Sequence, residues 1–326
     1  MIRNCLFFLL SFMLICTGIH AQRVRLSTEN DSLLRIQQDS LQYYSQQILR
    51  GKDESTRQTA NDRFIPLLVK ALKTPSSFYF PFDSLSTISI QYPQDSAFRI
   101  FSWGLEQETS FYRHYGAIQV RTDDGKLKLF PLFDNSDYMN NPDTIAGPKS
   151  WYGCLYYKIL HRRYFNKDYY TLFGWDANNI RSQKKLLDML TFKDSVPVFG
   201  GPYFSFMEDT IRKPTRNRFI LEYKKDATIS LSYNPDMDMI VFDHLISETN
   251  QPKKPSTFVP DLDYEGFKWK AGKWVHVEKV FHDALQLGKF PVVAPLDQKQ
   301  KNMTKPRTAE DINAEKLKQA APKKKQ

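Results

Sequence analysis

Apolar positions in the N-terminal quarter of the chain recur with the period of an α-helix. Residues 31–50 place leucine, isoleucine and tyrosine side chains on one stripe, and Gly51 follows as a typical helix-ending residue. Residues 53–73 carry a second helical pattern, in which Pro66 predicts a break because proline removes a backbone hydrogen bond. We therefore expect residues 22–77 to form a helical N-terminal segment, a hairpin of two helices.

From residue 78 onward the pattern changes to short aromatic and β-branched runs separated by turn residues, which is typical of antiparallel β structure. The expected strands cover residues 87–91, 98–105, 116–121, 127–133, 151–161, 169–175, 196–199, 203–208, 219–224, 228–233, 239–245, 266–270 and 273–280. Asp124-Gly125 and Ala271-Gly272 supply turns of hairpin length. Because the connections are too short for repeated parallel crossovers, residues 78–296 predict a mainly antiparallel β domain.

One segment of this domain predicts an inserted helix. Residues 179–190 place Leu186, Leu187 and Leu190 on one side, and an asparagine at 178 or 179 could cap the first turn. The predicted fold class is therefore α+β: an N-terminal helical hairpin followed by an open sandwich or curled sheet. A small β-propeller is the alternative.

The first 21 residues have the pattern of a secretory signal peptide. Arg3 supplies a positive charge, residues 5–19 form an apolar run, and Ala21 is a small residue suited to cleavage. The run of about 15 residues is shorter than the roughly 20 that a membrane-spanning helix needs. We expect export to the periplasm or the extracellular space, with no transmembrane segment once the leader is removed.

Positive charge is concentrated at the C-terminal end. The chain carries a formal net charge of +10, and residues 299–326 hold nine basic and three acidic side chains, a net +6. A basic segment with almost no aromatic residues cannot bury enough apolar surface to order itself, so residues 297–326 predict a disordered basic tail. Such a tail suits an anionic envelope surface, whereas nucleic acid is not expected because the rest of the chain is close to neutral.

Cysteine usage also bears on an exported chain. Two of the three cysteines lie in the leader, so Cys154 is the only one in the expected mature protein and no internal disulfide can form. The aromatic neighbours of Cys154 favour burial over a nucleophilic role. Stability should therefore come from packing.

Standard catalytic signatures are missing: there is no glycine-rich phosphate loop, no G-x-S-x-G elbow and no H-E-x-x-H. The histidines are scattered along the sequence, so we predict no metal and no cofactor. The candidate catalytic residues are polar side chains within or beside aromatic runs: Glu106, Glu108, Asp176, Asp243 and His244. Two carboxylates can hydrolyse a glycosidic bond, and a carboxylate can orient an imidazole, although adjacent strand residues face opposite sides.

Aromatic side chains are the candidates for binding. Trp103, Trp175, Trp269 and Trp274 can form a recognition surface, with core packing as the default for each.

Five short motifs carry a resemblance to known proteins: FGWD at 173–176, VFG at 198–200, VFDH at 241–244, PDLDY at 260–264 and GKW at 272–274. Together they resemble a family of uncharacterised exported proteins from Gram-negative bacteria. The resemblance spans residues 78–280 and implies no reaction, cofactor or catalytic residue.

The leading functional hypothesis is an exported, soluble cell-envelope protein that acts as a binding or assembly module rather than as an enzyme. Its expected partner is an envelope protein, a glycan or an anionic surface. The first alternative is a periplasmic or secreted hydrolase of glycans or peptides that uses paired carboxylates. The second is a carrier of an apolar ligand in a phenylalanine-lined pocket.

Overall fold

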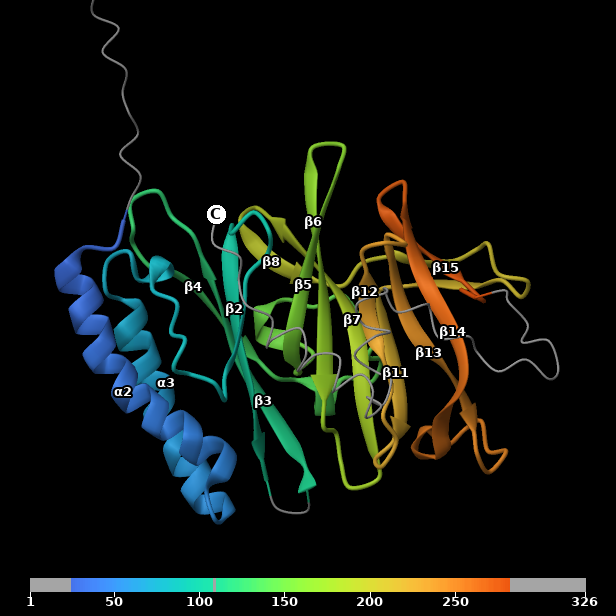
Figure 1. The fold of residues 1–326 in the computed structure, drawn as a ribbon, viewed down its shortest axis with the longest axis horizontal. Coiled ribbons are helices and arrows are strands. Elements are labelled where there is room, and N and C mark those ends of the chain that lie inside the picture. Colours follow the sequence, from blue (N-terminus) through green and yellow to red (C-terminus); the bar gives the residue numbers. More distant parts are fainter. Residues whose placement is uncertain (1–24, 108–109, 282–326) are drawn as a thin grey trace, which may run out of the picture. The chain divides into compact units, whose positions relative to one another are not determined.

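The computed structural model describes residues 25–107 and 110–281 (Figure 1). The predicted leader, the predicted basic tail and Glu108 lie outside the described residues. Neither described helix is apolar enough along its length to cross a lipid bilayer.

Both N-terminal helices begin at side-chain caps. Helix α2 (Thr28–Arg50) follows Ser27, whose hydroxyl accepts a hydrogen bond from the Asn30 amide, and it ends at Gly51. Helix α3 (Glu54–Leu72) follows Asp53, whose carboxylate accepts from the Thr56 amide at 2.7 Å. The expected break at Pro66 is wrong, because α3 continues through it. Pro66 lies on the exposed face, where water can bond the carbonyl that the proline leaves without a donor.

Fifteen strands follow within the described residues. They are β1 (Ser89–Gln91), β2 (Phe98–Glu106), β3 (Tyr112–Val120), β4 (Lys128–Phe133), β5 (Leu155–Tyr164), β6 (Lys167–Asp176), β7 (Ser182–Lys193), β8 (Val196–Phe199), β9 (Phe204–Phe206), β10 (Lys213–Arg216), β11 (Arg218–Lys224), β12 (Leu231–Asn234), β13 (Met239–Ser247), β14 (Phe258–Lys270) and β15 (Lys273–Val277). The predicted α+β class with a mainly antiparallel β domain is confirmed. The hairpin turn at Ala271-Gly272 is confirmed as well, and both residues have positive φ.

The strands form three sheets. The first sheet has the order β1-β2-β3-β4, and the second has the order β11-β7-β6-β5 with β8 added beside β7. The third sheet has the order β10-β9-β15-β14-β13-β12. Among the described strands, β15 and β9 are the only parallel neighbours. The sheets therefore form an open arrangement of hairpins.

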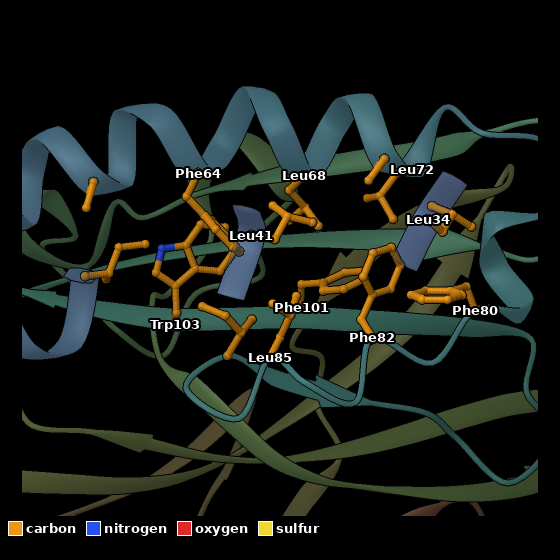
Figure 2. Packing of buried hydrophobic residues seen from close by; sticks show 14 of the residues in the cluster. Leu34, Leu41, Phe64, Leu68, Leu72, Phe80, Phe82, Leu85, Phe101 and Trp103 are labelled. Atoms are coloured by element: carbon orange, nitrogen blue, oxygen red, sulfur yellow. The ribbon is translucent and has the colours of Figure 1, made fainter. Parts of the chain in front are cut away.

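Three apolar cores separate four layers, which run from the helices through the first and second sheets to the third (Figure 1). The core under the helices joins leucines of α2 and α3 to Phe101 and Trp103 of β2 (Figure 2). The second core joins Phe98 and Ile100 of β2 to the second sheet. The third lies between the second and third sheets. The first and second sheets are thus covered on both faces.

Burial on both faces explains the wrong prediction of a helix at residues 179–190. The structure has strand β7 there, and Leu186 and Leu190 belong to the second core while Leu187 belongs to the third. A strand covered on both faces needs apolar residues at consecutive positions, and such a run imitates part of a helical stripe. The short edge strand β10 was not predicted, because its sequence is polar and exposed.

A buried arginine ties the segment after α3 to the first sheet. The Arg99 side chain is fully buried and donates hydrogen bonds to Gln119, to the Tyr92 hydroxyl and to the carbonyls of Phe80 and Ser77. Burial lowers the pKa of Arg99. Aromatic rings rather than a carboxylate surround the guanidinium among the described residues, with Phe101 and Phe82 at 4.8 and 5.0 Å from its carbon.

The tight packing of the second core predicts different costs for two glycine substitutions. A Cβ at Gly174 of β6 would lie 2.6 Å from the Cys154 sulfur and 2.9 Å from Leu186 Cγ, whereas a Cβ at Gly147 would meet nothing within 4 Å. We expect Gly174→Ala to lower the free energy of unfolding by about 1–3 kcal/mol. Gly147→Ala should stay within about 0.5 kcal/mol of the wild type. Urea unfolding measures both, and equal stabilities would contradict this account of the core.

Candidate functional site

A cleft of about 620 Å³ opens beside the outer strand of the second sheet. Its wall includes four consecutive residues of β11, from Phe219 to Glu222. Phe219 and Leu221 face the third core, while Ile220 packs against the second. Since residues that point to opposite faces of one strand line the same cleft, the edge of β11 itself forms the wall.

The backbone of β11 is unpaired along this edge. Among the described strands, β11 pairs with β7 alone and ends the order of the second sheet. Its first residue is fixed, because the Arg218 amide donates to Asp143 and the Arg218 guanidinium lies 2.8 Å from the Asp188 carboxylate. Both side chains of this ion pair are fully buried. The ion pair therefore holds the start of β11 against β7. The outer edge has no strand partner among the described strands, and the short turn η5 (Pro255–Thr257) lies near it.

The cleft carries both signs of charge. Lys213 and Arg216 of β10 are exposed, and their cationic groups lie over the Phe206 ring at 5.8 and 5.5 Å. Lys184 lies on the side of the second sheet that faces the first, with its amine 5.9 Å from the Tyr152 ring. Acidic groups from Glu222, Asp243 and Glu265 also line the cleft.

Imidazole and carboxylate groups alternate in a row that reaches the cleft at His244 and Glu265. His276 Nδ1 lies 2.9 Å from Asp209 Oδ1, and His276 Nε2 lies 3.0 Å from Glu265 Oε2. The other oxygen of Glu265 is 3.6 Å from His244 Nε2, and His244 Nδ1 lies 2.9 Å from Asp261. The row runs from the fully buried side chain of Asp209 to the partly exposed pair of His244 and Asp261. It places Glu265 between two imidazoles at the cleft.

The two acids beside His276 favour its charged form. Burial of the ring opposes a positive charge, but the hydrogen bonds to Glu265 and Asp209 outweigh burial and raise the pKa of His276. A charged His276 donates from both ring nitrogens, one to each acid. This arrangement keeps the Glu265 carboxylate oriented toward the cleft.

Two of the predicted catalytic residues lie at this cleft. Asp243 and His244 both line it, but they do not pair: Asp243 accepts a hydrogen bond from the Ser230 amide, while His244 contacts Asp261 and Glu265. This agrees with the expectation that neighbouring strand residues face opposite sides.

Asp176 lies in a different polar cluster, at the end of β6. His114 has Asp134 3.6 Å from Nδ1 and Asp176 3.8 Å from Nε2, and Lys184 lies 3.7 Å from Asp176. Burial acts to raise the pKa of Asp134, but contacts with His114 and Ser136 lower it to about 2. Asp134 also accepts from the Gly153 amide, where a Cβ would lie 2.2 Å from its carboxyl carbon. Asp134 and Gly153 are therefore tightly packed in this cluster.

Glu106 ends β2, where its carbonyl accepts a hydrogen bond from Arg57 of α3. It is not part of the cleft, so the structure does not bring Glu106, Asp176 and Asp243 together. The catalytic role suggested for each of them, and for Glu108 and His244, stays a prediction.

Two of the predicted recognition tryptophans are core residues. Trp103 donates to Asn61 and Trp274 donates to Thr171, each at 2.8 Å, and both side chains are buried. Exposed recognition is therefore wrong for Trp103 and Trp274, because the indole rings fill apolar cores and the N–H groups are satisfied inside. Trp175 and Trp269 are partly exposed and remain predictions. Cys154 is buried as expected, and burial raises its pKa.

No sequence pattern indicated the roles of Asp209, Glu265 and the β11 edge. His276 lies in the last predicted strand, but its two acids come from the β9–β10 turn and from β14. Only strand pairing brings them to the same ring.

Comparisons with known proteins give no further guide to this site. No protein-family model, curated protein or solved structure matches the chain. The resemblance to exported Gram-negative proteins stays a prediction. The functional argument therefore depends on the geometry of the cleft.

The raised pKa of His276 predicts a pH-dependent stability. A histidine whose pKa is higher in the folded state stabilises the fold fully below its unfolded value of about 6.5, and this contribution is lost as the pH rises through the folded pKa. We expect the stability advantage of the wild type over His276→Gln to shrink as the pH rises from about 6.5 into the alkaline range. Urea unfolding across this range tests it, and a difference that does not change with pH would contradict the charged state.

Proposed function

We propose that the protein is an exported binding module of the cell envelope, and that its cleft takes an extended segment of another polypeptide as an added strand on β11. The observation that carries this proposal is that an unpaired strand edge forms the wall of the cleft. Free backbone amides and carbonyls along such an edge are complementary to those of an extended peptide.

The two sides of the cleft suit the alternating side chains of a bound strand. Side chains on one face would meet Phe219, Phe242 and the His244 and Glu265 end of the row. Those on the other face would meet Tyr152 and Lys184. Exposed Lys213 and Arg216 favour an acidic residue in the segment. Backbone pairing supplies affinity and these contacts supply selectivity.

Export is supported by the sequence. The leader pattern at residues 1–21 and the resemblance to exported Gram-negative proteins favour the periplasm or the extracellular space. An envelope protein is the partner of choice, because a strand edge recognises a polypeptide rather than a glycan or an anionic surface.

Selection from a library of random linear peptides tests the proposal. A selected peptide should slow amide hydrogen exchange in β11, residues 218–224, and leave the edge strand β12 unchanged. Phe258→Ala removes an apolar cleft side chain and should weaken binding at least about tenfold, or about 1.4 kcal/mol. Phe165→Ala is the matched control, because Phe165 is 85% exposed in the β5–β6 turn and does not line the cleft.

The proposal fails if no peptide is retained, or if the protected amides lie outside β11. Equal binding by the Phe258→Ala and wild-type proteins would also count against it.

Acid–base hydrolysis of the bound segment is a second candidate, favoured by the position of Glu265 between two imidazoles at the cleft. We expect a selected peptide to be cleaved by the wild type and to stay intact with Glu265→Gln. Mass spectrometry of the incubated peptide distinguishes the two functions, since a peptide left intact by both proteins supports binding alone.

A further inference from the structure

All four histidines in the described part of the chain lie against two carboxylates, but one of them differs from the rest. At His114, His244 and His276 the two acids contact opposite ring nitrogens. At His161 both acids contact the same nitrogen: Asp168 Oδ1 lies 2.9 Å and Asp95 Oδ2 lies 3.7 Å from Nε2. A ring nitrogen carries at most one proton, so it can satisfy only one of these two oxygens.

Three segments bring these groups together. His161 is on β5, Asp168 is at the start of β6, and Asp95 precedes β2. The Tyr170 hydroxyl donates to Asp95 Oδ2 at 2.8 Å, and the Tyr170 ring stacks on His161 with centroids 4.9 Å apart. Tyr170 thus fixes both the carboxylate and the imidazole in this arrangement.

We propose that Asp95, His161 and Asp168 form a binding site for a divalent transition-metal ion, with Zn²⁺ as the best fit. The three ligand atoms lie within 4.8 Å of one another. A zinc ion about 2.1 Å from each ligand would place neighbouring ligand atoms roughly 3.4 Å apart in tetrahedral geometry. The separations of 2.9 and 3.7 Å from His161 bracket this value, and the two carboxylate oxygens lie within 4.8 Å of each other. Side-chain rotations would complete the site.

The chemistry of the ligands selects the ion. An imidazole nitrogen with two carboxylate oxygens suits Zn²⁺, whereas Ca²⁺ and Mg²⁺ prefer oxygen ligands alone. The two carboxylates balance the double positive charge. Their side chains are 30% and 41% exposed, which leaves room for water to complete the coordination.

Arg163 is the nearest competing cation, with Nε 3.9 Å from Asp168 Oδ1. Its side chain is 63% exposed and can turn toward solvent when a metal ion binds. Tyr170 would keep its hydrogen bond to Asp95 and orient this ligand. Hydrogen-bond donors that contact metal ligands commonly have this role.

Isothermal titration of the untagged full chain with zinc chloride tests the site. We expect one equivalent of Zn²⁺ to bind to the wild type and to be lost in His161→Ala. Tyr170→Phe keeps the ring but removes the hydroxyl, and should weaken binding roughly tenfold. Titration with magnesium chloride should give no comparable binding.

His244→Ala is the matched control, because His244 also lies between two carboxylates and is partly exposed, but its acids contact different nitrogens. It should keep the zinc equivalent that His161→Ala loses. Circular dichroism verifies folding of each variant, and Asp168→Asn replaces His161→Ala if the latter does not fold.

Absence of zinc binding to the wild type would overturn the proposal, as would equal zinc binding by the wild type and the folded ligand variant. Peptide binding at the β11 cleft is independent of either result.

Discussion

The structure depends on covering both faces of the first and second sheets. Antiparallel sheets commonly leave one face in water, but here β2, β6 and β7 contribute to two cores each. Every polar side chain placed inside must then find a partner inside, because an unpaired buried group is costly. Arg99 among aromatic rings and carbonyls, the Asp188–Arg218 ion pair, and Trp274 bonded to Thr171 meet this requirement.

The cleft forms where the chain passes from the third sheet to the second. Strand β10 belongs to the third sheet and β11 to the second, with only Asn217 between them. The chain crosses from one sheet to the other at this point, and the Asp188–Arg218 ion pair holds the crossing in place. As a result, the outer edge of β11 has no partner among the described strands and forms a wall of the cleft. The fold therefore supplies both the backbone edge and the groove that our proposed function needs.

The pairing of histidines with acids has a related cause. Strand pairing brings carboxylates from other segments of the chain to each described imidazole. The row through His276 orients Glu265 at the cleft, while the arrangement at His161 directs two oxygens to one point. The same residue types thus support different chemistry, according to which nitrogen each acid contacts.

The sequence by itself determined the local elements: two helices, most of the strands, and the turn at Ala271-Gly272, because periodicity and turn residues act over a few neighbours. It failed at β7, where burial on both faces replaced the alternation that marks a strand, and at Pro66, where solvent exposure allowed the helix to continue. Tertiary structure alone decided that Trp103 and Trp274 are buried, that β11 is an edge, and that acids distant in sequence converge on His161 and His276. These features depend on the pairing and layering of distant strands, which no local pattern encodes.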